Sequence, residues 1–111
     1  MKISKDLNAA TARALVLGML QDGESYGYAL IQRVKELSGG TVEWTEGTLY
    51  PVLHRLEAEG LIRARWGESE AGRRRKYYRL TPQAVPAMKE DRRQWEAMHG
   101  VLSQLWKLRH A

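Results

Sequence analysis

The chain has 111 residues, of which 43% are hydrophobic and 28% charged, and its formal net charge is +5. This length suits one ordinary domain and excludes two large domains, and the apolar content is sufficient for a folded core. No stretch approaches the ~20 apolar residues of a membrane span, and the N-terminus lacks the apolar region of a secretory signal, so we expect a cytoplasmic protein with no membrane partner. Cysteine is absent, which excludes disulfides, thiolate nucleophiles and Cys-based zinc sites.

Two helices are predicted in the first forty residues. The first runs from about Leu7 to Leu20 and is apolar nearly all round between residues 14 and 20, so it should be central to the core. The second is expected to start with Ser25 as its cap and to end at Gly39-Gly40. The following residues, Thr41–Trp44, have strand composition and are expected to form a small edge strand.

A third helix is predicted from a Thr45 cap to Gly60, with Pro51 early in it at the loss of one backbone hydrogen bond. Its core face follows the i, i+3, i+4, i+7 pattern and consists of Leu49, Val52, Leu53 and Leu56. Its opposite face consists of Thr48, Pro51, His54, Arg55 and Ala58. These side chains are small or able to hydrogen-bond, which suits close approach to a partner.

The next segment is predicted to be a β-hairpin. Apolar or aromatic residues alternate with arginine from Leu61 to Trp66 and again from Lys76 to Leu80, and the tip from residue 68 to 74 is too polar to pack. Between residues 61 and 80 there are seven Lys/Arg and two Asp/Glu, so this segment carries a charge equal to that of the whole chain. One basic arm on a neutral body is the pattern expected for binding an extended polyanion.

The last predicted element is one long helix that opens at Thr81-Pro82 and runs to about Arg109, with Pro86 delaying its regular part. Apolar residues follow a heptad, with Asp91 as the exception. The members of this stripe are Met88, Trp95 and Leu102 at one position and Ala84, Met98 and Leu105 at the other. Such a stripe requires a partner helix.

Three helices, a basic hairpin and a long helix are the element order of a winged helix-turn-helix domain, in a mainly α (α+β) fold. We expect residues 1–81 to form the DNA-binding part and residues 82–111 a C-terminal dimerisation helix, in one compact unit. The third helix would contact base edges, and the hairpin cations would neutralise phosphates.

Four spaced motifs between Leu7 and Thr81 resemble those of PadR-family transcriptional regulators. They are Tyr26-Gly27-Tyr28, Gly47-Thr48-Leu49-Tyr50-Pro51, Leu53-X-Arg55-Leu56-Glu57-X-Glu59-Gly60-Leu61 and Arg75-Lys76-Tyr77-Tyr78-Arg79-Leu80-Thr81. The resemblance implies a homodimer, held by the C-terminal helix with help from the first, that represses from a palindromic operator in double-stranded DNA. The single short C-terminal helix is similar to that of the smaller branch of the family.

By the same resemblance, Thr48, Tyr50 and Arg55 belong to the recognition helix, and Arg74 and Lys76 belong to the wing. The other candidate DNA-binding residues are Tyr28, Pro51, His54 and Arg73. Glu46 departs from the family pattern of proline or a small residue, and its carboxylate would repel phosphate unless the helix N-terminus or Arg55 offsets it. This departure bears on the details of docking.

Trp95 has two interpretations. Its position resembles that of the tryptophan in multidrug-sensing members of the family, where a pair of rings sandwiches planar, often cationic compounds. Asp91 and Glu96 would favour a positive ligand there, and Met88 and Met98 would give an adaptable wall. Alternatively, Trp95 and Trp106 fill the dimer seam as interface anchors without any cavity.

Two other classes of function compete with DNA binding. An enzyme is not expected, because His54, His99 and His110 are far apart in the sequence and no serine lies in a known catalytic motif; we predict no catalytic residue, metal site or cofactor. The basic run Arg73–Lys76 taken alone could be a solvated charge run. A winged helix that associates with another protein is the alternative, although its hairpin would normally be less basic.

Overall fold

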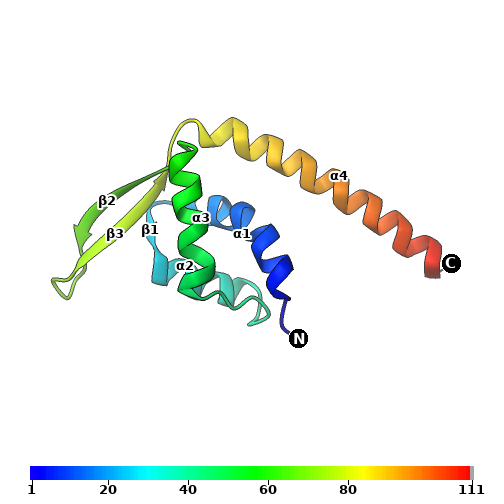
Figure 1. Cartoon of the computed structure of the whole chain (residues 1–111), viewed down its shortest axis with the longest axis horizontal. Coiled ribbons are helices and arrows are strands. Elements are labelled where there is room, and N and C mark those ends of the chain that lie inside the picture. The colour runs from blue at the N-terminus through cyan, green and yellow to red at the C-terminus, as the bar shows by residue number, and fades with distance from the viewer. Residues whose placement is uncertain (111) are drawn as a thin grey trace.

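A computed structural model describes residues 1–110, and Ala111 at the end of the predicted dimerisation segment lies outside them. The elements in chain order are α1 (Lys5–Leu20), β1 (Ser25–Tyr26), α2 (Gly27–Leu37), α3 (Glu46–Ala58), β2 (Ile62–Glu68), β3 (Arg74–Leu80) and α4 (Ala84–His110). In Figure 1 the β2–β3 hairpin projects to one side of a helical body, whereas α4 begins near the base of the hairpin and extends beyond the opposite side. This arrangement confirms the predicted winged helix-turn-helix with a long C-terminal helix.

The core lies where α1, α2 and α3 meet the base of the sheet. Val16 and Leu17 of α1 and Leu49 and Leu53 of α3 are almost fully buried, as the helical spacing predicted. Tyr78 of β3 is buried in the same cluster. Each such side chain contributes roughly 1.5–3 kcal/mol of transfer free energy, so the core fixes how the sheet and α3 lie relative to each other.

Two local predictions were wrong. Ser25 does not cap α2, because its backbone pairs with Tyr78 and that of Tyr26 with Tyr77 in the three-stranded sheet β1-β3-β2. The segment Thr41–Trp44 is not a strand: it follows a turn in which the Thr41 N–H donates to the Ser38 carbonyl, and Trp44 is buried in the core. In both cases tertiary contacts overrode local propensity.

Helix α1 begins two residues earlier than expected. Ser4 caps it, because the Ser4 hydroxyl accepts a hydrogen bond of 3.2 Å from the Leu7 N–H. The early start extends α1 toward the turn after α2, where the Ile3 N–H donates to the Thr41 carbonyl. The N-terminus is thereby held against the body.

The start of α3 is as predicted. The Thr45 hydroxyl accepts from the Thr48 N–H at 3.2 Å and caps the helix. Pro51 lies inside α3 and has no backbone N–H, so the Gly47 carbonyl lacks the helical hydrogen bond that residue 51 would otherwise donate. At the other end, Gly60 adopts φ 77°, and its carbonyl accepts from the Thr81 hydroxyl at 2.6 Å, which ties the sheet to the end of α3.

Helix α4 begins at Ala84, three residues after Thr81. Pro86 lies in its first turn, where the missing backbone N–H of proline costs no helical hydrogen bond. The apolar stripe divides into two parts. Ala84 is fully buried and Met88 is half-buried against the body, whereas the stripe residues from Trp95 onward are exposed. The distal half of α4 therefore extends away from the body, as Figure 1 shows.

Candidate nucleic-acid interface

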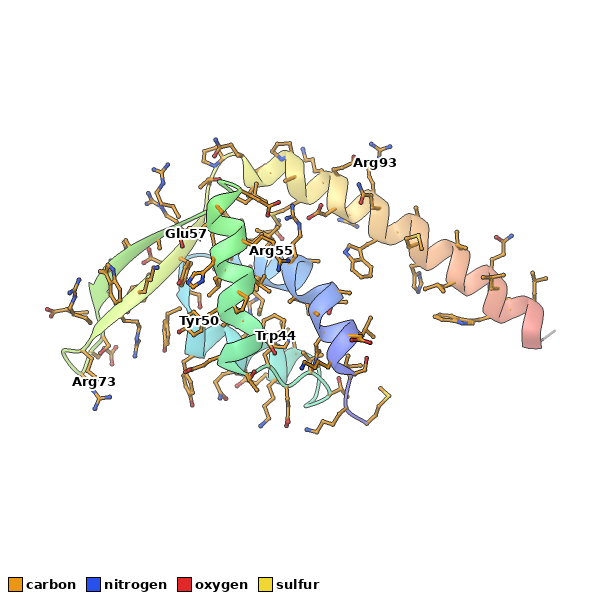
Figure 2. All side chains as sticks on the ribbon, in the orientation of Figure 1. Trp44, Tyr50, Arg55, Glu57, Arg73 and Arg93 are labelled. Atoms are coloured by element: carbon orange, nitrogen blue, oxygen red, sulfur yellow. The ribbon has the colours of Figure 1, made fainter. Side chains whose placement is uncertain are left out.

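The outer face of α3 is formed by the residues that the sequence singled out. Tyr50, Pro51, His54 and Arg55 are exposed, and the Thr48 hydroxyl lies 3.3 Å from that of Thr45. The opposite face of the helix is held in the core, so α3 cannot rotate to present other side chains. Figure 2 shows Tyr50, Arg55 and Glu57 along this helix.

Tyr50 also fixes the contact between α3 and α2. A Cβ atom on Gly27 would lie 2.7 Å from the Tyr50 hydroxyl oxygen, so only glycine lets the tyrosine lie over the start of α2. Tyr28, the next residue of α2, is 66% exposed. The start of α2 and the outer face of α3 therefore form one surface, which carries Tyr28 and Tyr50.

The hairpin has two faces, because side chains alternate along each strand. In the β2–β3 register Trp66 lies opposite Lys76, and Glu68 lies opposite Arg74. We call these four positions the inner wing face, because Lys76 Nζ lies 3.9 Å from the Glu57 carboxylate of α3. The Arg74 guanidinium lies 4.8 Å from the centre of the Trp66 ring.

The outer wing face carries the other cations of the strands, Arg63, Arg65, Arg75 and Arg79. Two of them have partners within the fold. Arg65 forms a two-point ion pair with Glu24, with Nε 2.7 Å from Oε2, and this hydrogen bond lowers the pKa of Glu24. Arg75 lies 3.8 Å from the centre of the Tyr26 ring. The hairpin cations, which the sequence presented as one group, therefore belong to two surfaces.

The wing tip is a tight turn between Ser69 and Arg73. The Ser69 N–H donates to the Arg73 carbonyl at 2.8 Å, and Gly72 adopts φ 78°. Arg73 extends from this tip into solvent, as Figure 2 shows. Arg73, Arg74 and Lys76 thus continue the surface of α3 outward along the hairpin.

Tyr78 lies behind this surface, where the hairpin meets α3. Its hydroxyl is buried and has no hydrogen-bond partner among the residues that the structure describes. Burial raises the pKa of Tyr78 to about 12, with smaller contributions from the nearby Glu57 and Tyr50. Tyr78 therefore serves the packing between wing and helix.

The predicted ligand residues lie around the base of α4. A cavity of about 510 Å³ between α1 and α4 is lined by Met88, Asp91 and Trp95, and a smaller neighbouring one of about 370 Å³ by Asp91, Trp95 and Met98. Glu96 lines neither of these two cavities and pairs with Arg92 at 2.7 Å. Trp95 is 42% exposed at the edge of both.

The two ion pairs of Arg13 could not be foreseen from the spacing of residues along the chain. Arg13 of α1 donates from Nε to Asp91 at 2.9 Å and from Nη1 to Glu59 at 2.7 Å. The hydrogen bond to Asp91 is the main cause of the raised pKa of Arg13. One arginine therefore joins α1, the end of α3 and the base of α4.

Metal and membrane sites are not found in the part of the chain that the structure describes. The described side chains, those of residues 1–108, include no group of three or more His, Asp or Glu placed to hold a metal ion. Their helices include none that is both long and apolar enough to cross a bilayer. His54 lies on α3 and His99 on α4, whereas the side chain of His110 is outside the described part.

A helix-turn-helix followed by a basic hairpin defines the class of winged-helix DNA-binding domains. The model of the transcriptional regulator PadR-like family matches residues 16–90. The chain therefore belongs to the PadR-like family of transcriptional regulators, and it is a DNA-binding regulator and not an enzyme.

Individual relatives agree with this assignment. The transcriptional regulator Rv3488 of Mycobacterium tuberculosis is 39% identical over 94 residues, which cover 85% of this chain and 84% of the relative. A transcriptional regulator from Clostridium thermocellum superposes with a TM-score of 0.83 at 31% identity, covering 92% of this chain and 96% of that structure. A PadR-family transcriptional regulator from Eggerthella lenta gives a TM-score of 0.75 at 33% identity, with coverages of 90% and 85%.

Proposed function

We propose that this chain is a cytoplasmic repressor that binds a palindromic operator in double-stranded DNA as a homodimer. The observation that carries the proposal is the surface on which the exposed face of α3 continues into the inner wing face and the tip. In this proposal residues 1–81 bind DNA and residues 82–111 dimerise. The family assignment supports the DNA partner, and the geometry supports the roles of individual residues.

The proposed roles follow from position on this surface. Thr48, Tyr50 and Arg55 on α3 contact base edges in the major groove, with Pro51 and His54 beside them. Tyr28 contacts the backbone from the start of α2, and Arg73, Arg74 and Lys76 contact phosphates. Glu46, in the first turn of α3, is placed where the positive end of the helix dipole offsets its charge.

The distal half of α4 supports the homodimer. Trp95, Met98, Leu102 and Leu105 are 41–58% exposed and recur at heptad spacing, which suits a second helix of the same kind. An apolar groove of about 290 Å³ beside α1 is lined by residues that include Ile3, Leu7, Val42 and Trp95. In a two-fold symmetric dimer, the α4 helix of the partner would pack along the exposed heptad stripe and into this groove, and would cover both apolar surfaces.

Analytical ultracentrifugation tests the dimer. Leu105→Lys places a charge in the proposed seam and should give monomers, whereas Gln104→Lys places the same charge outside the apolar stripe and should leave the dimer intact. Equal behaviour of the two variants would refute this interface. A monomeric wild-type chain would refute the dimer itself.

Operator recognition is tested on DNA selected from a random pool by the wild-type dimer. Thr48→Ala or Arg55→Ala should reduce discrimination between the selected and a scrambled duplex by about 1–3 kcal/mol for each base interaction that the substitution removes. Arg93→Ala, on α4, removes a charge far from α3 and should leave discrimination unchanged (Figure 2). Equal losses on both duplexes would refute base recognition by Thr48 and Arg55. An expression reporter carrying the selected sequence then separates repression from activation.

We also propose that a planar aromatic cation binds beside Trp95 and releases the DNA. The 510 Å³ cavity supports a planar aromatic ligand, because it has the size of a small-molecule site and its lining includes a tryptophan and a methionine. Lys89 and Arg92 also line it and Asp91 pairs with Arg13, so a cationic ligand would have to share Asp91 with Arg13. Such a ligand acts only if it favours a dimer geometry with the wrong separation of the two α3 helices.

Titration of a planar cationic dye against tryptophan fluorescence separates a pocket from a filled seam. Saturable quenching that is abolished in Trp95→Ala supports the pocket, provided that Trp106→Phe still shows it. Absence of quenching at micromolar dye would mean that Trp95 packs the interface without leaving room for a guest.

A further inference from the structure

Trp66 is a large aromatic side chain on a charged arm. It lies on the inner wing face two residues before the end of β2, and its side chain is 58% exposed. Its cross-strand partner is Lys76, and the Arg74 guanidinium lies over its ring. The core residue on the same face of β2, Ile62, is four positions away at the base of the hairpin.

Trp66 does not belong to the hydrophobic core. An indole that packs in a core loses most of its exposure, as Trp44 does at 5%. Trp66 keeps more than half of its surface in water, and the exposed part of the ring gains no free energy from hydrophobic burial. An exposed aromatic ring beside two cations is therefore better explained by a partner that is both apolar and anionic.

We propose that Trp66 is a DNA-contacting residue that packs on a deoxyribose of the backbone, while Arg74 and Lys76 bind the phosphates on either side. The DNA backbone alternates apolar sugars with anionic phosphates, and the inner wing face combines one aromatic ring with two cations and a single anion, Glu68. The inference rests on the proposed DNA-binding surface and adds an uncharged contact to it.

Contact with the sugar is favoured over insertion between base pairs. An aromatic wedge that inserts between two base pairs stacks on the bases through its ring faces. One face of the Trp66 indole is already covered by Arg74. The ring also comes from a paired strand position, whereas the free tip of the wing begins at Ser69.

Binding of a fluorescently labelled duplex over a range of salt concentrations tests this assignment. Trp66→Ala should weaken binding roughly tenfold, as expected when an aromatic anchor is removed, and it should leave the log–log salt slope unchanged because the charge stays the same. Trp66→Phe should bind within about threefold of wild type, since it keeps an aromatic ring. Arg63→Ala, on the outer wing face, serves as the matched control and should have little effect on either quantity.

Two optical readouts keep the test decisive if Trp66→Ala folds poorly. Part of the tryptophan emission should change when DNA binds to wild type, and this part should be missing in Trp66→Phe. A 2-aminopurine base placed in the contacted region of the duplex should keep its low fluorescence on binding, because it stays stacked. Equal emission changes in the two proteins, or wild-type affinity of Trp66→Ala, would overturn the assignment, and an unstacked 2-aminopurine would overturn sugar contact in favour of insertion.

The inference and the proposed function fail in different ways. If wild type does not bind any duplex, the DNA-binding surface itself is wrong. If wild type binds and Trp66→Ala binds equally well with the same salt slope, only the role of Trp66 is wrong.

Discussion

The division of the wing into two faces predicts which cations control the salt dependence of DNA binding. Arg74 lies on the inner face, whereas Arg63 lies on the outer face and forms no ion pair with the described side chains of residues 1–108. Replacing either residue with alanine removes the same charge. Only Arg74→Ala should remove an interaction with phosphate, because only the inner face borders α3.

The size of the effect follows from the proposed homodimer. Removing one phosphate interaction lowers the log–log salt slope by about 0.9, so one substitution present in two protomers lowers it by about 1.8. Between 50 and 200 mM salt, the affinity advantage of wild type over Arg74→Ala should therefore shrink roughly tenfold. Lys76→Ala should have a smaller effect, because Glu57 at 3.9 Å already offsets part of the Lys76 charge.

Fluorescence anisotropy of a labelled duplex at three or more salt concentrations measures these slopes. We expect a clear change for Arg74→Ala and almost none for Arg63→Ala. Equal slopes for the two variants would show that the hairpin acts as one undifferentiated charged arm, and the reasoning from strand alternation would then be refuted.

Three further predictions concern the residues that hold the surface in place. Arg13→Met keeps the packing of the side chain but removes its ion pairs with Asp91 and Glu59. Because these ion pairs are partly exposed, the free energy of unfolding should fall by about 1 kcal/mol, which is ~4 °C in the midpoint of thermal unfolding. The fall should be smaller when Arg13→Met is made in an Asp91→Asn background. Burial raises the pKa of Tyr78 to about 12, above its ordinary value of 10, so the unfolded chain ionises first and stability should fall as pH rises from 10 toward 12; urea unfolding should show a weaker fall in Tyr78→Phe. Gly27→Ala should displace Tyr50 and weaken DNA binding about as much as Tyr50→Ala, with no further weakening in the double variant, and an additive effect would contradict that contact.

Much of the fold could be predicted because the deciding information is local. The core face of α3 follows helical spacing, and the Thr45 cap and the glycine after the helix mark its ends. Strand β1 could not be predicted in this way. It has only two residues, and its pairing with Tyr77 and Tyr78 depends on chain segments about fifty positions apart.

The candidate DNA residues were also accessible from the sequence, since the motif of α3 and the basic hairpin are continuous segments. The partition of the hairpin cations was less accessible. It depends on the register of β2 with β3, and on partners distant in sequence such as Glu24 for Arg65 and Glu57 for Lys76. The pairing of Arg13 with Asp91 likewise joins residues from opposite ends of the chain.

In the proposed complex, two copies of this chain present α3 and the inner wing face to one duplex. Hydroxyl-radical footprinting on the selected operator tests it most directly. We predict two equivalent protected patches on one side of the DNA, with centres about one helical turn (~34–36 Å) or a multiple of it apart. A single patch, or uniform protection that is the same on scrambled DNA, would contradict the claim.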